Sequence, residues 1–293
     1  MTYALFLGCS VPVRAPNYEL SARKVASRLG IPLADVDDFA CCGYPLAAVS
    51  ELGAFAMAAR NLALAADRGH DIVALCSACS GFLMESAHRL REDPELRDRV
   101  NAVLAPFGLG FDARKPVAVK SIVSVFLENR GEERIRAAVT APLRNVRVAV
   151  HYGCHVLRPR SLHGEEDPEN PGSIDRLVAL AGGESVAYEH RLACCGGGIL
   201  GIKEDTALRV ARRKLDAVAE SKADAMVLVC PFCSVMFEGN QKKIEKSFGT
   251  SYGLPVLYLT QFLGLAMGMS ADDLGFPMNR IKAQGLLDKL ASV

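Results

Sequence analysis

The sequence lacks the features that would connect its function to a membrane, a nucleic acid or a nucleotide. No apolar run reaches the roughly 20 residues of a membrane-spanning helix, and the N-terminus lacks the basic start and cleavage site of a secretory signal. The formal net charge is only +1, no block of roughly five like charges occurs, and no G-x-G-x-x-G motif is present. We therefore expect a cytoplasmic protein with no transmembrane segment, no nucleic-acid partner and no nucleotide or flavin motif of its own.

Cysteine is too sparse for a disulfide-stabilised scaffold. The chain has ten cysteines among 293 residues, about 3%, whereas disulfide scaffolds typically contain about 8–10%. A reducing cytoplasm would keep these thiols free, and free thiols are open to oxidation. Ten cysteines in such a chain therefore indicate metal binding or redox chemistry.

The cysteines form the same pattern twice. Each set contains a single cysteine, an adjacent pair and a C-x-x-C motif, separated by 31, 33 and 2 residues in the first set and by 39, 34 and 2 in the second. The sets are Cys9, Cys41, Cys42, Cys76 and Cys79, then Cys154, Cys194, Cys195, Cys230 and Cys233. Each pair is followed by glycine, and each C-x-x-C motif follows an apolar run. The repeat predicts two homologous domains, residues 1–143 and 144–293.

Apolar segments alternate with helical patterns in both halves. Continuous apolar runs at 3–8, 71–75, 146–152, 185–188 and 225–229 are typical of buried parallel strands. Helices are predicted at 19–29, 52–66, 81–90, 173–181 and 205–219, while 94–107 and 122–127 are interpreted as extra helices without counterparts in the second half. The sequence therefore predicts an α/β fold with two similar domains around a pseudo-twofold axis. Four cysteines follow strands, at the edge where open α/β sheets bind ligands, so we expect the metal site near the interdomain cleft.

Thiolate sulfur favours iron–sulfur, zinc or copper(I). A C-x-x-C motif at the start of a helix directs two sulfurs at one metal, and the free N–H groups there stabilise the thiolates. The adjacent pairs need a turn, because successive side chains of an extended segment point to opposite sides, and Gly43 and Gly196 give the backbone that freedom. Five cysteines per half exceed the four ligands that close a structural zinc site. Either one thiol per half is free and reactive, or an unusual cluster takes five sulfur ligands.

The double pattern resembles the cysteine-rich CCG signature of the heterodisulfide reductase B subunit, and the resemblance extends over nearly the whole chain. In that family each repeat binds a noncubane [4Fe-4S] cluster through five cysteines, so the resemblance implies that all ten cysteines bind two such clusters. It also implies an oxidoreductase that acts on a disulfide held between the clusters. The implied partners are a ferredoxin-like C subunit and a flavoprotein A subunit.

Two features favour a bacterial branch of that family. The first pair continues as Cys41-Cys42-Gly43-Tyr44-Pro45, where the methanogen enzymes tend to carry proline directly after the pair. The chain is also rich in Ala and Arg. The leading hypothesis is therefore a sulfur-oxidising complex that handles a thiol, a disulfide or lipoate-bound sulfur, in place of the coenzyme M–coenzyme B substrate.

Two other functions stay open at this point. Similar double cysteine-rich domains occur in oxidoreductases that act on lactate, glycerol 3-phosphate, or fumarate and thiols, where the clusters only relay electrons. The chain is alternatively a zinc-stabilised scaffold protein with no redox role.

Two histidines and a group of basic residues carry further hypotheses. His155 directly follows Cys154, and the resemblance places a histidine near the substrate here, so we expect His155 to donate a proton to a leaving thiolate. His151 lies within a predicted strand and is interpreted as a hydrogen-bonded core residue. The basic residues after the second Cys-Cys-Gly loop are interpreted as a solvated helix face, with binding of an anionic substrate group by one of them as the alternative. They are Lys203, Arg212, Arg213 and Lys214.

Overall fold

Two four-stranded parallel sheets form the framework of the protein. The computed structural model describes residues 2–162 and 166–292. The first sheet has the order β2-β1-β3-β4 and contains β1 (Tyr3–Phe6), β2 (Leu33–Ala34), β3 (Asp71–Ala74) and β4 (Val119–Ser121). The second has the order β6-β5-β7-β8 and contains β5 (Arg147–His151), β6 (Glu184–Ser185), β7 (Ala225–Leu228) and β8 (Val256–Tyr258). Every strand pair is parallel, which confirms the predicted duplicated α/β fold.

Helices connect and cover the strands in both halves. The first half contains α1 (Val11–Arg14), α2 (Pro16–Arg28), α3 (Glu51–Asp67), α4 (Ser77–Glu92), α5 (Pro94–Leu104), α6 (Ile122–Leu127) and α7 (Gly131–Ala138). The second contains α8 (Ser173–Leu180), α9 (Glu204–Glu220), α10 (Pro231–Ser234), α11 (Gln241–Phe248), α12 (Leu259–Ala266) and α13 (Gln284–Ala291). Single 3-10 turns lie at Tyr44–Leu46, Ala105–Phe107, Arg160–Leu162, Gly197–Ile199 and Phe276–Met278, and a π turn at Val235–Gly239 extends α10. Every helix within the described ranges is too short or too polar to cross a membrane.

One element was misinterpreted from the sequence. Residues 122–127 form α6, which follows β4 as α12 follows β8, so α6 does have a counterpart in the second half. The sequence concealed this match because α12 lies inside one apolar run that also contains β8. In the first half, α5 packs against α3 and α4.

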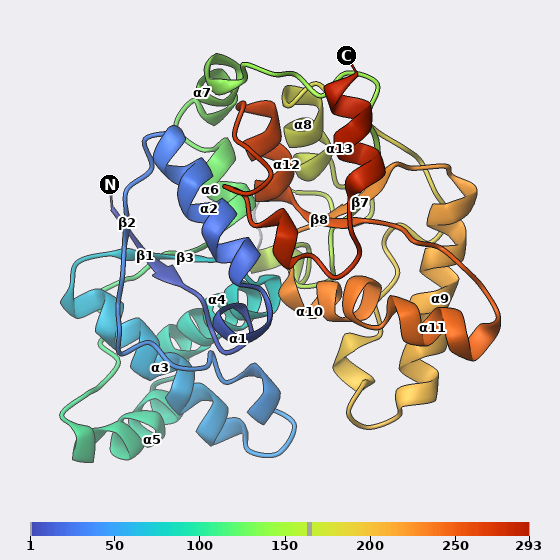
Figure 1. Ribbon diagram of the computed structural model, residues 1–293. Coiled ribbons are helices and arrows are strands. Elements are labelled where there is room, and N and C mark those ends of the chain that lie inside the picture. The colour runs from blue at the N-terminus through green and yellow to red at the C-terminus, as the bar shows by residue number, and fades with distance from the viewer. Residues whose placement is uncertain (1, 163–165, 293) are drawn as a thin grey trace.

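The two halves also contact each other away from the sheets. α2 of the first half packs along α12 of the second (Figure 1). The ring of Tyr18 stacks on that of Tyr258 with a centroid distance of 4.0 Å, and the hydroxyls of Ser21 and Thr260 lie 2.7 Å apart. These contacts are buried, so they help to fix the position of one half against the other. The division at residue 143 stays a prediction.

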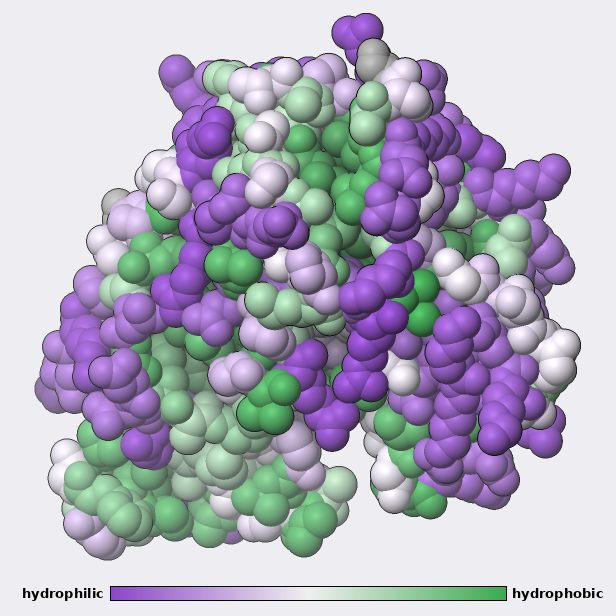
Figure 2. Space-filling model, viewed as in Figure 1, coloured by the Kyte–Doolittle hydropathy of each residue, from purple (hydrophilic) through white to green (hydrophobic). Residues whose placement is uncertain are grey.

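Figure 2 shows a notch between the lower ends of the two halves, with apolar residues on both projecting tips. Two strongly exposed apolar side chains follow the cysteine pairs at corresponding places. They are Val49, which is 85% exposed, and Ile202, which is 87% exposed.

Candidate metal centre

The sheet topology explains why cysteines follow the central strands. In each sheet the second strand in the sequence lies on one side of the first, and the third strand lies on the other side. The strand order therefore reverses between the two central strands, which are β1 and β3 in the first sheet and β5 and β7 in the second. A crevice forms beyond the carboxyl ends of such strands, and ligands bind there. Cys9 and Cys76 follow β1 and β3, and Cys154 and Cys230 follow β5 and β7. The topology therefore places one pair of cysteines at each crevice.

The first cysteine set forms a connected group. Cys41 and then Cys79 lower the pKa of the Cys42 thiol, and Cys42 and then Cys76 raise that of Cys79, so these four side chains lie close to one another. Cys9 lies close enough to raise the pKa of Cys41. All five side chains are free thiols, and exposure falls from Cys9 on the surface to the buried Cys76. The first set thus leads from solvent to the centre of the molecule.

The second set repeats this arrangement. Cys194 and then Cys233 lower the pKa of the Cys195 thiol, and Cys195 and then Cys230 raise that of Cys233, so these four side chains lie close to one another. Burial, and then the nearby Cys195 and Cys230, raise the pKa of the Cys154 thiol. Cys154 and Cys194 are exposed, whereas the other three are buried.

The two sets meet at their buried ends. The sulfurs of Cys76 and Cys230 lie 4.0 Å apart, although the residues are 154 positions apart in the sequence. The hydroxyl of Ser77, from the first half, also interacts with Cys230 and lowers the pKa of its thiol. The ten predicted ligand residues therefore form one continuous sulfur-rich region across the boundary between the halves.

The turn after each cysteine pair requires glycine. Gly43 has a φ of 98°, and a Cβ there would lie 2.4 Å from the backbone O of Ala54. Gly196 has a φ of 84°, and its Cβ would lie 2.8 Å from the backbone O of Ala207. Both the left-handed backbone and the close approach to a helix exclude a side chain. This turn lets both sulfurs of a pair face the same region.

Each pair contains one thiol that ionises easily. Hydrogen bonds from Cys41 and then Cys79 lower the pKa of Cys42 to about 4. Hydrogen bonds from Cys194 and then Cys233 lower the pKa of Cys195 to about 4, and the N–H of Gly197 donates to this sulfur at 3.3 Å. Because thiolate is the form that binds metal, both halves present a ligand that is ready at neutral pH.

The donor set fits an iron–sulfur group better than a single ion. A cluster distributes its thiolate ligands over several irons, so its sulfurs need to share a region and not a point. Five sulfurs per half in such a region satisfy that condition.

His155 lies at the boundary between the halves. Its Nδ1 is 3.2 Å from the sulfur of Cys154, and its ring meets that of Tyr44 edge-on with a centroid distance of 4.8 Å. On the other side, α4 packs so closely that a Cβ at Gly81 would lie 3.1 Å from the backbone O of His155. Two first-half elements therefore hold this second-half histidine beside an exposed cysteine.

Lys214 corrects the interpretation of a solvated helix face. Its side chain is only 1% exposed, and Nζ donates to the backbone O of Ala193 at 2.6 Å, just before the second cysteine pair. The sequence carries a signal for this burial. Lys214 lies at helical spacing on the stripe of α9 that buries Ala207, Ala211 and Val218, although its charge argued for solvent.

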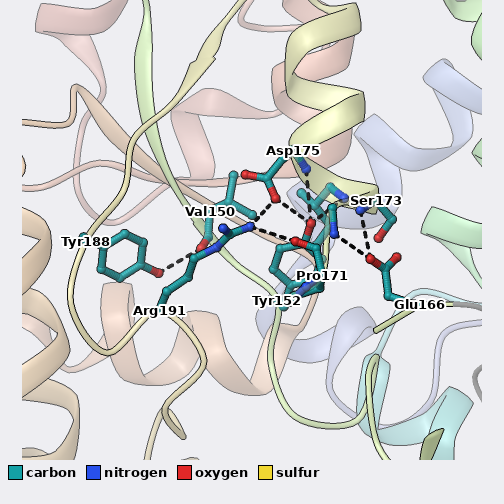
Figure 3. Close-up of polar contacts among 10 residues, drawn as sticks. Val150, Tyr152, Glu166, Pro171, Ser173, Asp175, Tyr188 and Arg191 are labelled. Atoms are coloured by element: carbon teal, nitrogen blue, oxygen red, sulfur yellow. Dashed lines mark hydrogen bonds and ion pairs between the residues drawn. The ribbon is translucent and has the colours of Figure 1, made fainter. Parts of the chain in front are cut away.

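A polar network supports the longer connection in the second half (Figure 3). The Tyr152 hydroxyl donates to Asp175 at 2.6 Å and accepts from the N–H of Ile174. Arg191 forms an ion pair with Asp175 and donates to the backbone O of Pro171 at 3.2 Å. The network links β5, α8 and the segment that leads to Cys194. It was not identifiable from the sequence because its members are scattered over 40 positions.

A cavity of about 250 Å³ opens beside the sulfur-rich region. It lies between Ser10 and Arg14 of the first half and Gly197 and Phe232 of the second. These residues adjoin Cys9, the second cysteine pair and the second C-x-x-C motif. A small molecule in this cavity would therefore contact both halves.

Known proteins match the chain along its whole length. Residues 3–84 and 148–238 each match the model of the CCG family, described as a cysteine-rich domain. The chain is 33% identical over 294 residues to the B subunit of the ferredoxin:CoB-CoM heterodisulfide reductase of Methanosarcina mazei, which covers 99% of this chain and 97% of that protein. It is also 33% identical over 285 residues to the 8-methylmenaquinol:fumarate reductase membrane anchor subunit of Wolinella succinogenes, with coverage of 97% and 98%.

A solved structure shares the fold. The crystal structure of a hypothetical protein from Helicobacter pylori aligns with a TM-score of 0.76 and 18% identity over 96% of this chain. The aligned part is 52% of the Helicobacter protein, so this chain spans about half of that protein's length. Two matches to the cysteine-rich domain, together with the identity over nearly the full length, show that this chain belongs to the family of heterodisulfide reductase B subunits.

Proposed function

We propose that this chain is the catalytic subunit of a heterodisulfide-reductase-like complex and carries out disulfide–thiol redox chemistry with two noncubane [4Fe-4S] clusters. One observation carries the proposal: two five-cysteine sets, one from each half, come within 4.0 Å of each other at Cys76 and Cys230. A substrate at the boundary would face both sets. The relationship to a heterodisulfide reductase supports the same chemistry.

The cysteines divide between two clusters by half. The first would be held by Cys9, Cys41, Cys42, Cys76 and Cys79, and the second by Cys154, Cys194, Cys195, Cys230 and Cys233. Bound clusters supply single electrons, and two of them match the two electrons that an S–S bond takes up. The preformed thiolates of Cys42 and Cys195 would anchor one cluster each.

The chain supplies position and protons. When a disulfide is reduced, its S–S bond breaks and each sulfur takes up one electron and one proton. His155 lies between Tyr44 and α4, where it would hold a proton beside the exposed Cys154. Its neighbours restrict the ring to this place, which favours transfer to a sulfur at the boundary between the halves. His155 is therefore the proposed proton donor.

The proposed substrate is a small thiol or a protein-bound sulfur such as a lipoyl group, handled in the oxidative direction. Two thiols then form an S–S bond, their two electrons pass to the clusters, and His155 accepts the proton that it donates in the reverse reaction. The cavity between Arg14 and Phe232 is lined by residues that neighbour cysteines of both sets in the sequence, which makes it the proposed entry for a flexible arm. Because the sequence has no nucleotide or flavin motif, electrons would pass to other proteins of the complex. The proposed partners are a ferredoxin-like C subunit and a flavoprotein A subunit.

A second candidate function is electron relay. The Wolinella relative is named as part of an 8-methylmenaquinol:fumarate reductase. In a protein of that kind, paired cysteine-rich domains would carry electrons without binding a sulfur substrate. The exposure of Cys9, Cys154 and Cys194 at the surface is equally compatible with electron transfer to a docked partner.

Electron paramagnetic resonance separates the two functions. Anaerobically purified protein would be titrated with lipoamide disulfide and, in parallel, with the coenzyme M–coenzyme B heterodisulfide. A catalytic protein should show a cluster signal that changes when one of these substrates is added, and the change should reach a maximum as the substrate concentration rises. A signal that neither disulfide changes, from clusters that still accept electrons, would favour the relay.

A further inference from the structure

Lys214 brings a buried positive charge close behind the second cysteine pair. Its Nζ donates to the backbone O atoms of Ala193 at 2.6 Å and Arg191 at 2.9 Å, and lies 2.9 Å from Nδ1 of His151. Because an ammonium group only donates, the imidazole accepts this hydrogen bond at Nδ1. None of these three partners carries a negative charge. In the part of the chain that the structure describes, Lys214 forms no ion pair with a carboxylate.

His151 does not compensate this charge. Burial, and then the Lys214 ammonium, lower its pKa well below the usual value for histidine, so the imidazole is neutral. Its ring packs edge-on against Phe237 with a centroid distance of 4.9 Å. Its Nε2 has no hydrogen-bond partner among the described residues. The imidazole therefore orients the ammonium without neutralising it.

The ionisable side chains that favour the Lys214 ammonium are cysteines of the second set. Burial lowers the pKa of Lys214 to about 8, while Cys233, Cys195, Cys194 and Cys154 act in the opposite direction and favour the ammonium. A buried cation is costly unless an anionic group compensates it. Thiolates of the second set, or a cluster that they hold, supply that compensation.

The first half has a neutral side chain at the corresponding place. Asn61 and Lys214 each lie ten residues beyond the first residue of their helices, α3 and α9. Asn61 donates through Nδ2 to the backbone O of Cys41 at 3.1 Å and accepts at Oδ1 from the N–H of Ala40 at 3.0 Å. Both residues thus brace the backbone at a cysteine pair, but only Lys214 is charged.

The central strands β1 and β5 also end in different side chains in the two halves. Phe6 is paired with Ala74 at the end of β1, and His151 is paired with Leu228 at the corresponding end of β5. The hydrocarbon ring of Phe6 therefore occupies the place of the imidazole that binds Lys214. The first half offers no equivalent partner for an ammonium.

We propose that Lys214 raises the reduction potential of the second-half cluster above that of the first-half cluster. This inference rests on the proposed function, because it requires a cluster in each half. A cluster gains a negative charge when it is reduced, so a nearby ammonium stabilises the reduced form. Burial strengthens the effect, since solvent and salt screen a buried charge poorly. Five similar ligands in each half would then hold clusters of unequal potential, and an electron shared between the halves would reside mainly in the second.

The first test uses the unmodified protein. Anaerobic holoprotein would be titrated potentiometrically at constant pH, with the clusters followed by electron paramagnetic resonance. Cys42→Ala and Cys195→Ala would assign the signals to the first and second halves. We expect two midpoint potentials, of which the higher belongs to the second half. Equal potentials, or a higher potential in the first half, would overturn the inference while leaving the proposed clusters in place.

The second test removes the charge. Lys214→Met keeps an unbranched buried chain, and we expect the reduced-to-oxidised ratio of the second-half cluster at a fixed potential to fall at least tenfold. That change corresponds to about 59 mV for one electron. The first-half cluster should not change. Lys203→Met removes an exposed charge at the start of the same helix and should change the ratio by less than about twofold.

The outcomes are distinguishable. A Lys214→Met protein that keeps both clusters and both potentials contradicts the inference. If this variant loses iron from the second half, its potentials cannot be compared. The inference then stands or falls on which half has the higher midpoint potential in the unmodified protein. A protein that binds no iron and sulfide in either half refutes the proposed function itself.

Discussion

The two halves of the molecule share a scaffold but differ in the side chains behind the cysteine pair. Both have the same strand order, a cysteine after each central strand and a glycine turn after the pair. Behind this turn the first half places the amide of Asn61, and the second half places the ammonium of Lys214. The comparison teaches that backbone topology determines where the sulfurs lie, whereas a few buried side chains determine the charge that surrounds them.

The halves also differ in how the segment before the pair is held. In the first half this segment contains α2, which packs on α12 of the other half. In the second half it is longer, and the network of Tyr152, Asp175 and Arg191 holds it (Figure 3). Both segments contact the opposite half, since α8 packs on α6 and α7, but the polar network is particular to the second-half segment.

The largest expected effect separates the two cysteine sets. Cys195→Ala removes the second-half thiol with the lowered pKa, so we expect the second cluster to be lost or converted while the first-half spectrum stays. Cys42→Ala is the mirror-image control and should affect only the first half. Iron content and visible absorption measure both effects. Loss of both clusters in either variant would show that the halves do not assemble independently.

Removal of the proposed proton donor should have the next largest effect. His155 has no histidine at the corresponding place in the first half, where Ser10 follows Cys9. We expect His155→Ala to keep both clusters but to slow disulfide turnover by roughly 10²-fold, as is typical for loss of a general acid. His88→Ala, an exposed histidine on α4, is the control. Unchanged turnover and unchanged pH dependence would refute the role of His155.

The glycine turns allow a matched comparison of stability. A Cβ at Gly43 would lie 2.4 Å from a backbone oxygen, closer than the 2.8 Å at Gly196. We expect Gly43→Ala to lower the free energy of unfolding by about 2 kcal/mol or more, and Gly196→Ala somewhat less. Gly198→Ala should be close to neutral, because no atom lies within 4 Å of its Cβ position. Urea unfolding measures all three, and equal effects at Gly43 and Gly198 would contradict the account of the turn.

The smallest expected effect concerns the second-half network. Tyr152→Phe removes the hydroxyl that joins Asp175 to the N–H of Ile174 but keeps the ring beside Arg191. Because Asp175 keeps its ion pair, we expect a loss of only about 1 kcal/mol of folding free energy. The potential of the first-half cluster should not change. A stability equal to that of the unmodified protein would show that the network is not needed to hold this segment.

The sequence predicted the parts of the fold that follow from strong patterns. The four-residue and five-residue apolar strands β1, β3, β5 and β7 were recognisable because both of their faces are buried. The edge strand β2 was not, since two half-buried residues carry no periodicity. The cysteines after the central strands were placed correctly, because the ends of parallel strands meet at one sheet edge.

The parts of the site that the sequence did not predict depend on tertiary contacts. Lys214 was taken for a surface residue because charge normally outweighs position in a helical stripe. Its burial depends on hydrogen bonds to the carbonyl oxygens of Arg191 and Ala193 and to His151. The contact between Cys76 and Cys230 likewise depends on how the halves pack. That all ten cysteines bind metal, and that His155 is catalytic, stay predictions.

The central claim is that each half holds an inorganic centre on five thiolates, and metal analysis of anaerobically purified protein tests it most directly. Iron and acid-labile sulfide should each be present at about four per half, and Cys195→Ala should reduce the content to about half. Zinc without sulfide would contradict the claim and favour a zinc-stabilised scaffold.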